Sequence, residues 1–254
     1  MTTDLSSHSE RTIAVFADFE NLALGAEQSN KGRFQMDLVL KRLLERGRIV
    51  LKRAYCDWNR FNNFTREFHL NGFELTDIPQ SKVGGKNSAD IRMVVDALDL
   101  CYSKTHIDTF ALLTGDSDFS PLVSKLKEND KRVLGCGVRS STSDLLAASC
   151  DEFLFYDDLV VASKRPRRRS KKEHTDQQRE VFERLTEIVA SLETDYDPLW
   201  GSMVKKTLKR VYPDFAESAY GYRNFSELLK DAKREGVIGM EVGDGGNYKV
   251  WSAA

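Results

Sequence analysis

The chain has 254 residues, with 38 Lys and Arg against 39 Asp and Glu and a formal net charge of −1. This length predicts one large domain or two of unequal size, and 41% hydrophobic with 30% charged residues is typical of globular chains rather than disordered ones. No apolar run approaches the ~18 residues of a membrane span, so we expect no membrane association. The four cysteines lack CxxC spacing and the N-terminus lacks the apolar stretch of a secretory signal, so we expect a cytoplasmic protein.

Charge is unevenly distributed along the chain. Residues 1–162 carry a net charge of −4, residues 163–174 carry +6, and residues 175–254 carry −3. The basic run SKRPRRRSKKEH contains no large apolar residue and cannot form a core, so it predicts a linker between two folded units. The linker is either a solvated spacer, a strap that tracks phosphates or a localisation signal.

We therefore expect two domains, at residues 10–162 and 176–252, with the linker at 163–175. The first domain alternates apolar runs with helical patterns. In chain order these predict strand Thr12–Ala17, helix Met36–Leu44, strand Ile49–Tyr55, helix Asn63–Leu70, strand Phe73–Ile78, a helix from Ser88, strand Thr109–Leu113, helix Pro121–Lys127, strand Arg132–Gly135, helix Ser143–Ser149 and strand Glu152–Tyr156. Such alternation predicts an α/β fold with a mostly parallel sheet and helices on both faces.

The helix from Ser88 has apolar residues at steps of three and four. They are Ile91, Val94, Val95, Leu98 and Tyr102. This spacing predicts an amphipathic helix.

The second domain begins with an amphipathic helix, Asp176–Leu192. Helices around Met203–Val211 and Ser226–Glu235 follow, and then two short strands, VIGMEV and NYKVW, joined across a Gly-rich turn. Three helices and a hairpin predict a small winged-helix α+β domain.

Carboxylates follow the strands of the first domain. Asp18 ends the first strand, Asp116 and Asp118 follow the fourth, and Asp90 lies in the first turn of the helix after the third. Ligands of open α/β sheets bind outside the carboxyl ends of the strands, so we expect these four side chains at one edge.

Crowded carboxylates repel one another, and a divalent cation relieves that repulsion. Oxygen ligands without Cys or His favour Mg²⁺ or Mn²⁺, and such an ion can polarise a phosphoryl oxygen and lower the pKa of bound water. The four histidines lie in no recognisable motif, so imidazole acid–base chemistry is not expected and metal-assisted phosphodiester hydrolysis fits the residues best. Each aspartate also has a plain structural explanation, as a turn former, a helix-dipole partner or a helix cap.

Three ordered segments carry a family resemblance: VFADFEN, KNSADIRMVVDAL and LLTGDSDFSPLVSKLKENDKRVLGCGV. They resemble the NYN domain, a branch of the PIN-like nuclease fold, over most of residues 10–160. The resemblance implies a three-layer α/β/α domain and metal-dependent RNA cleavage. It implies catalytic and metal-binding roles for Asp18, Asp90, Asp116 and Asp118, with Asn21, Thr114 and Ser117 as supporting residues.

The second domain resembles the LOTUS, or OST-HTH, winged-helix family. The resemblance rests on the Pro213-Asp214-Phe215 corner, on Tyr220-Gly221-Tyr222 and on Phe225. It implies RNA binding, to single-stranded or G-rich structured RNA. The candidate RNA contacts are Lys205, Lys206, Lys209, Arg210 and Tyr220, with Arg167, Arg168 and Arg169 in the linker.

The sequence thus predicts a metal-dependent ribonuclease with an RNA-binding module. Two alternatives are a non-catalytic RNA-binding regulator with a vestigial acidic site and a metal-dependent phosphatase acting on a small phosphate ester. The lack of a nucleophile motif and the appended RNA module argue against the phosphatase. The sequence is compatible with both a monomer and a homo-oligomer.

Overall fold

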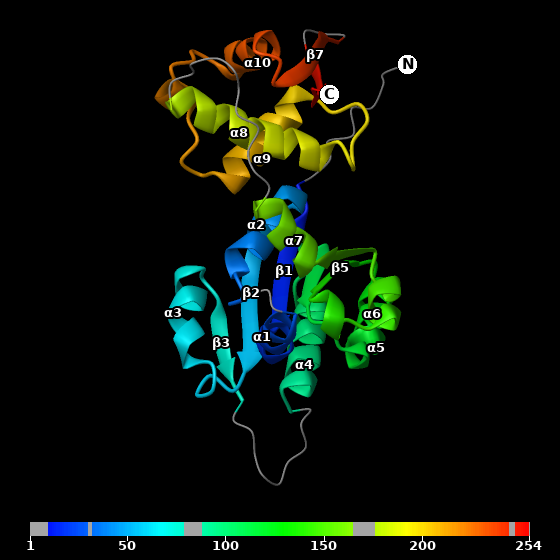
Figure 1. Cartoon of the computed structure of the whole chain (residues 1–254). Coiled ribbons are helices and arrows are strands. Elements are labelled where there is room, and N and C mark those ends of the chain that lie inside the picture. The colour runs from blue at the N-terminus through cyan, green and yellow to red at the C-terminus, as the bar shows by residue number, and fades with distance from the viewer. Residues whose placement is uncertain (1–9, 30–31, 79–87, 165–175, 244–246, 254) are drawn as a thin grey trace, which may run out of the picture. The chain divides into compact units, whose positions relative to one another are not determined.

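The computed structural model describes residues 10–29, 32–78, 88–164, 176–243 and 247–253 (Figure 1). Contacts within the chain divide it into two compact units, Met1–Arg165 and Pro166–Ala254. Among the described residues, no helix is long and apolar enough to cross a bilayer. Two features predicted from the sequence, the basic run with Arg167, Arg168 and Arg169 and most of the Gly-rich turn at 244–246, lie outside the described residues.

The first unit is built on a six-stranded sheet. Its strands are β1 Thr12–Asp18, β2 Arg48–Cys56, β3 Glu74–Asp77, β4 Thr109–Leu113, β5 Arg132–Gly137 and β6 Glu152–Phe155. They lie in the order β3-β2-β1-β4-β5-β6, and every neighbouring pair is parallel. The predicted parallel sheet is confirmed. From β1 the chain adds β2 and β3 on one side, and it then adds β4, β5 and β6 on the other side. The switch point therefore lies between β1 and β4, and open α/β sheets bind their ligands at the carboxyl edge of such a point.

Helices cover both faces of this sheet. They are α1 Phe19–Gln28, α2 Met36–Arg46, α3 Asn62–Leu70, α4 Ser88–Ser103, α5 Ser120–Glu128, α6 Asp144–Ser149 and α7 Tyr156–Lys164, with short 3₁₀ turns η1 Ser117–Phe119 and η2 Arg139–Ser141. Side chains of a strand alternate between its faces. Ile13, Val15 and Ala17 pack with α1, α2, α3 and α7, while Ala14 and Phe16 pack with α4, α5 and α6. The three-layer α/β/α architecture is therefore confirmed.

Helices α1 and α7 were not predicted from the sequence. Each begins at the residue directly after a strand, so no turn residue separates the two elements. The sequence predicts Tyr156 as the end of the last strand, whereas it is the first residue of α7. Helix α1 also contains Gly25, where a Cβ atom would lie 2.4 Å from the Ser141 hydroxyl oxygen and 3.0 Å from the Val138 Cβ, so close packing here favours this poor helix former.

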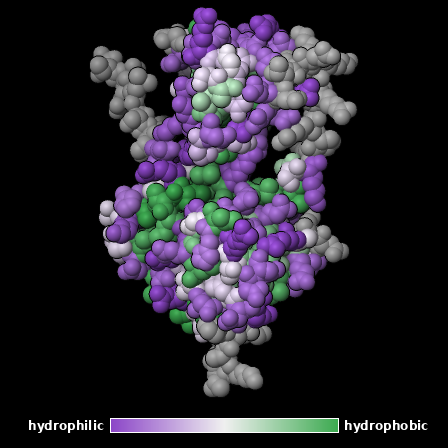
Figure 2. All heavy atoms as spheres, turned by 90° about the vertical axis from the view of Figure 1, so that its left-hand side faces the viewer, coloured by the Kyte–Doolittle hydropathy of each residue, from purple (hydrophilic) through white to green (hydrophobic). Residues whose placement is uncertain are grey.

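The helix predicted from Ser88 is present as α4. Its buried residues are Met93, Ala97, Leu100 and Cys101, whereas three of the five apolar residues at helical spacing, Ile91, Val95 and Tyr102, are exposed. Ala97 and Cys101 are small, so the sequence pattern gives them less weight than the larger apolar residues Ile91, Val95 and Tyr102. In the view from the α3 side, apolar residues gather on the surface of this unit (Figure 2).

The second unit consists of α8 Asp176–Leu192, α9 Gly201–Val211, the 3₁₀ turn η3 Glu217–Tyr220, α10 Phe225–Arg234, and strands β7 Ile238–Val242 and β8 Tyr248–Ser252. The two strands pair antiparallel. Phe215, Tyr222 and Phe225 are buried in a core shared by all three helices and the hairpin. The small α+β domain predicted from the sequence is confirmed.

Candidate active site

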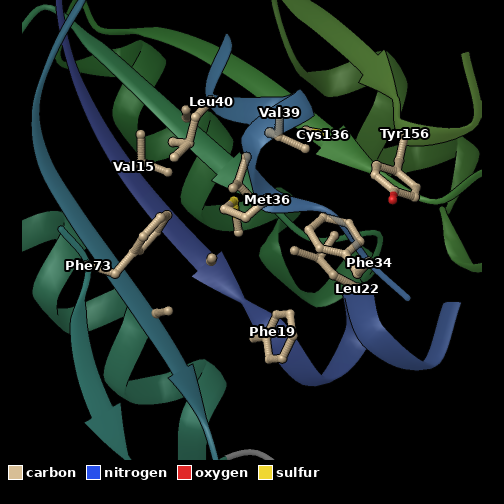
Figure 3. Packing of buried hydrophobic residues seen from close by; sticks show 14 of the residues in the cluster. Val15, Phe19, Leu22, Phe34, Met36, Val39, Leu40, Phe73, Cys136 and Tyr156 are labelled. Carbon is tan, nitrogen blue, oxygen red and sulfur yellow. The ribbon is translucent and has the colours of Figure 1, made fainter. Parts of the chain in front are cut away.

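A cluster of aromatic side chains fixes the chain directly after β1. Phe19 lies in edge contact with Phe64 and Phe68, at ring-centroid distances of 4.8 and 4.6 Å, and stacks on Trp58 at 5.6 Å. Figure 3 shows Phe19 just beyond the end of β1, on the side of the sheet where Phe34 packs. Ala17, which precedes Asp18 in β1, is buried on this same side, so alternation along the strand directs the Asp18 side chain to the opposite side, that of α4.

Asp18 is a buried carboxylate, 9% exposed, at the carboxyl end of β1. One of its oxygens accepts a hydrogen bond from the Asn21 backbone N–H at 3.3 Å, which caps α1, and the other accepts one from the Thr114 hydroxyl at 3.0 Å. Burial, above all, and the nearby charges of Asp90 and Asp116 raise the pKa of Asp18 to about 7, although these two hydrogen bonds oppose the shift.

The loop after β4 is tied to the loop after β1. The Asn21 side-chain oxygen accepts a hydrogen bond from the Gly115 N–H at 2.9 Å, and the Thr114 hydroxyl oxygen accepts one from the Asp116 N–H at 3.2 Å. A Cβ atom at Gly115 would lie 2.2 Å from the Ser141 carbonyl oxygen, so this close approach requires glycine. These bonds hold the ends of β1 and β4 together where the strand order reverses.

Asp116 and Asp118 lie at the start of η1. Asp116 accepts a hydrogen bond from the Asp118 N–H at 3.0 Å and so caps this turn. Asp116 is half-buried and Asp118 is exposed. Ser117 is the first residue of η1, and within the described part of the chain its hydroxyl makes no hydrogen bond.

Asp90 lies in the first turn of α4 and is half-buried. Burial first, and then the charges of Asp116, Asp118 and Glu20, raise the pKa of Asp90 to about 6. The four predicted aspartates therefore share one negatively charged region. Among the described residues, no Lys or Arg forms an ion pair with any of them.

Glu20 is a further acid at this edge that the sequence analysis did not select. Its carboxylate pairs with the Arg60 guanidinium at 2.8 Å and contributes to the raised pKa of Asp90. The signal that points to it is its place in the DFEN segment, directly after a buried strand. Its pairing with Arg60 makes it a weaker candidate than the four aspartates.

The oxygen atoms of these four aspartates are the kind of ligand that a hard divalent cation prefers. All four candidates offer carboxylate oxygens, and added positive charge would relieve their mutual repulsion. Within the described ranges, no three His, Cys, Asp or Glu side chains converge closely enough to hold an ion by themselves. Mg²⁺ commonly binds through one or two carboxylates and completes its shell with water and substrate phosphate, and this arrangement suits that mode.

The predicted RNA contacts of the second unit fall into two groups. Lys206 and Lys209 are exposed on α9, whereas the Lys205 ammonium pairs with Glu217 at 2.7 Å. Arg210 is half-buried and donates a hydrogen bond to the Thr207 hydroxyl at 3.1 Å. Tyr220 is half-buried and stacks on the core residue Phe215 at a centroid distance of 5.8 Å. The exposed lysines are thus the side chains best placed to meet a phosphate backbone.

Each of the two units matches a known protein family. The NYN domain matches residues 12–157, more than half of the chain. The chain belongs to the NYN domain family. An OST-HTH/LOTUS domain matches residues 177–250 of this NYN protein. The order of the two domains along the chain is the one predicted from the sequence, and their combination supports a nuclease or RNA-binding role.

Individual proteins also resemble this NYN chain. An uncharacterized protein of Methanocaldococcus jannaschii is 30% identical over 142 residues, which cover 56% of this chain and 54% of that protein. The chain thus matches about half the length of this curated relative. The crystal structure of a protein of unknown function from Vibrio parahaemolyticus has a TM-score of 0.53 at 23% identity, covering 63% of this chain and 98% of that one, and this likeness shows the fold alone.

Proposed function

We propose that this chain is a metal-dependent ribonuclease that hydrolyses RNA phosphodiesters at the carboxyl edge of its parallel sheet. The observation that carries the proposal is Asp18. It is a buried carboxylate whose pKa is raised by burial and by Asp90 and Asp116, and no described cationic side chain pairs with it. A buried acid surrounded by other acids is costly for the fold, and such costs concentrate at functional sites.

The group that best relieves this charge is Mg²⁺ or Mn²⁺. Asp18, Asp90, Asp116 and Asp118 would hold it, together with water and substrate phosphate. When bound, such an ion supplies charge stabilisation to the phosphoryl group and activates water for attack.

The chain's own residues would position this site. The Thr114 hydroxyl and the Asn21 backbone N–H hold the two oxygens of Asp18 in fixed directions, and the Asn21 side chain holds the loop after β4 through Gly115. With a pKa of about 7, Asp18 can keep a proton near neutral pH and release it when positive charge arrives. Asp118 is exposed, so a substrate phosphate can approach the site from its side.

The second unit would supply RNA affinity. Lys206 and Lys209 are exposed on one helix and can meet successive phosphates, although the unit as a whole carries excess acid. RNA that is single-stranded or G-rich and structured is the substrate class that the family resemblance implies. In this proposal the second unit binds RNA and the first unit cleaves it.

One observation favours a second candidate, a non-catalytic RNA-binding regulator. Asp18 caps α1 and Asp116 caps η1, so both have structural roles that need no metal. In that case the acidic edge is a vestige, and RNA binding would persist without turnover.

Replacing Asp90 with Asn separates the two candidates. Because Asp90 accepts no hydrogen bond from a described residue, the variant should fold normally yet lose about 100-fold in RNA cleavage with Mg²⁺ or Mn²⁺. The matched control is Asp144→Asn, since Asp144 is an exposed first-turn aspartate of α6. Equal cleavage by the two variants would remove Asp90 from the site, and wild-type protein that binds RNA without cleaving it would favour the regulator.

A further inference from the structure

Helix α4 carries an apolar stripe that nothing in the described part of the chain covers. Ile91, Val95 and Tyr102 are 63%, 55% and 62% exposed, and Leu98 lies between them, half-buried. Among the described residues, the other large hydrophobic side chains that are exposed lie one to an element: Val50, Leu70, Leu145, Val161, Val242 and Trp251. Single exposed apolar residues are ordinary, whereas a row of them on one helix marks an interaction surface.

The spacing of this α4 stripe is that of a helix–helix seam. Its four residues follow one another at steps of four, three and four, the pattern of the apolar positions in paired helices. The side of α4 that packs on the sheet is different and is already filled by Met93, Ala97, Leu100 and Cys101. The helix therefore has two apolar sides, and the outer one has the pattern of a surface that meets another helix.

The α4 stripe is complementary to itself when two copies run antiparallel. About a two-fold axis midway between Val95 and Leu98, Ile91 falls opposite the second copy's Tyr102, and Val95 opposite the second copy's Leu98. Large and small side chains then alternate across the seam. A self-complementary patch of this kind is what a two-fold homodimer requires.

Charges beside the stripe fit the same register. Arg92 and Asp99 are seven residues apart and so lie on the same flank of the helix. In the antiparallel pair, Arg92 of each copy lies beside Asp99 of the other copy. The Arg92 Nε donates to Asp96 at 3.0 Å, but its terminal amino groups make no bond to a described residue, and Asp99 has no described partner. Both are available for pairing across the axis.

We infer that α4 pairs antiparallel with α4 of a second copy of this chain, through Ile91, Val95, Leu98 and Tyr102 and two Arg92–Asp99 ion pairs. Stable interfaces bury roughly 800 Å² on each partner, more than one four-residue stripe supplies. The dimer is therefore weak and depends on concentration. The first turns of the two helices, with their Asp90 residues, lie ~20 Å apart along the seam, since the helix rises 1.5 Å per residue.

Sedimentation velocity of the full chain over a hundred-fold range of concentration tests this inference. The wild-type protein should shift from one copy to two as concentration rises. Val95→Lys places a charge in the seam and should abolish the shift, while Val161→Lys, at an exposed valine of α7, should leave it unchanged. A wild-type chain that stays monomeric throughout, or two lysine variants that behave alike, would overturn the inference.

A charge exchange tests the register itself. Arg92→Glu and Asp99→Arg should each weaken the dimer several-fold, because each places like charges together, and the double variant should restore it. Failure of the double variant to recover would overturn the antiparallel register. A monomeric wild-type chain whose RNA binding is weakened by Val95→Lys would assign the stripe to RNA instead. None of these readouts needs nuclease activity, so the outcome is separate from that of the proposed function.

Discussion

Replacing Asp116 and Asp118 together with Asn is expected to lower metal-dependent RNA cleavage by about 1,000-fold or more while the protein stays folded. Two of the four carboxylates of the proposed site would be lost, including Asp118, the exposed one. The fold should survive because Asn is as good a cap as Asp, so the bond from the residue-118 N–H that starts η1 is kept. The measurement is the single-turnover cleavage rate of a short single-stranded RNA with saturating Mn²⁺.

A second pair of aspartates provides the control for this double variant. Asp157 and Asp158 follow β6 at the same edge of the sheet; one accepts a hydrogen bond from the Arg139 N–H at 2.7 Å and the other pairs with the Arg139 guanidinium at 2.8 Å. Changing both to Asn removes two negative charges, as the site variant does, but at positions outside the proposed site. If that control and the site variant cleave RNA equally well, the assignment of Asp116 and Asp118 is wrong.

The stability of the protein should fall as pH rises from about 4 to about 8 when no divalent ion is present. The folded state raises the pKa of Asp18 from 3.8 to about 7 and that of Asp90 to about 6, so between these limits it holds more protons than the unfolded chain. Stability that depends on bound protons is complete below the unfolded pKa and is lost as pH rises through the folded one. For Asp18 alone the loss is on the order of 4 kcal/mol at most.

Asp18→Asn isolates this contribution from the other titrating groups. The unfolding free energies of both proteins are measured by urea denaturation at several pH values in EDTA. The value for the wild type minus that for the variant should decrease steadily as the pH rises from about 4 to about 8. Above pH 7 the variant should be the more stable protein. If Asp18 were only a helix cap that prefers to be ionised, the variant would be the less stable one at high pH, so the sign of the difference decides between the two.

Much of the fold is predictable because its signals are local. The buried run Thr109–Leu113 was predicted to the residue, since a continuous apolar stretch between polar segments marks a central parallel strand. The convergence of Asp18 with the acids after β4 followed from topology alone, because parallel strands end at one edge. Two apolar stripes share helix α4, and only packing shows which of them meets the sheet.

The finer features of the site are not local and were not predictable. The raised pKa of Asp18 depends on burial and on Asp90, which lies 72 positions along the chain. The hydrogen bond from the Gly115 N–H to the Asn21 side chain joins two loops that are far apart in the sequence. The pairing of Lys205 with Glu217 likewise needs the folded second unit, where the basic cluster on α9 is partly neutralised.

Mn²⁺ titration followed by calorimetry tests most directly whether Asp18 of β1, Asp90 of α4 and the two aspartates after β4 act as one cation site. The wild-type chain should bind Mn²⁺, and Asp18→Asn and Asp118→Asn, from two separate segments, should each weaken binding by about 10-fold or more. Asp144→Asn, at the first turn of α6, should bind as the wild type does. Mn²⁺ affinity that is the same in all four proteins would contradict the account.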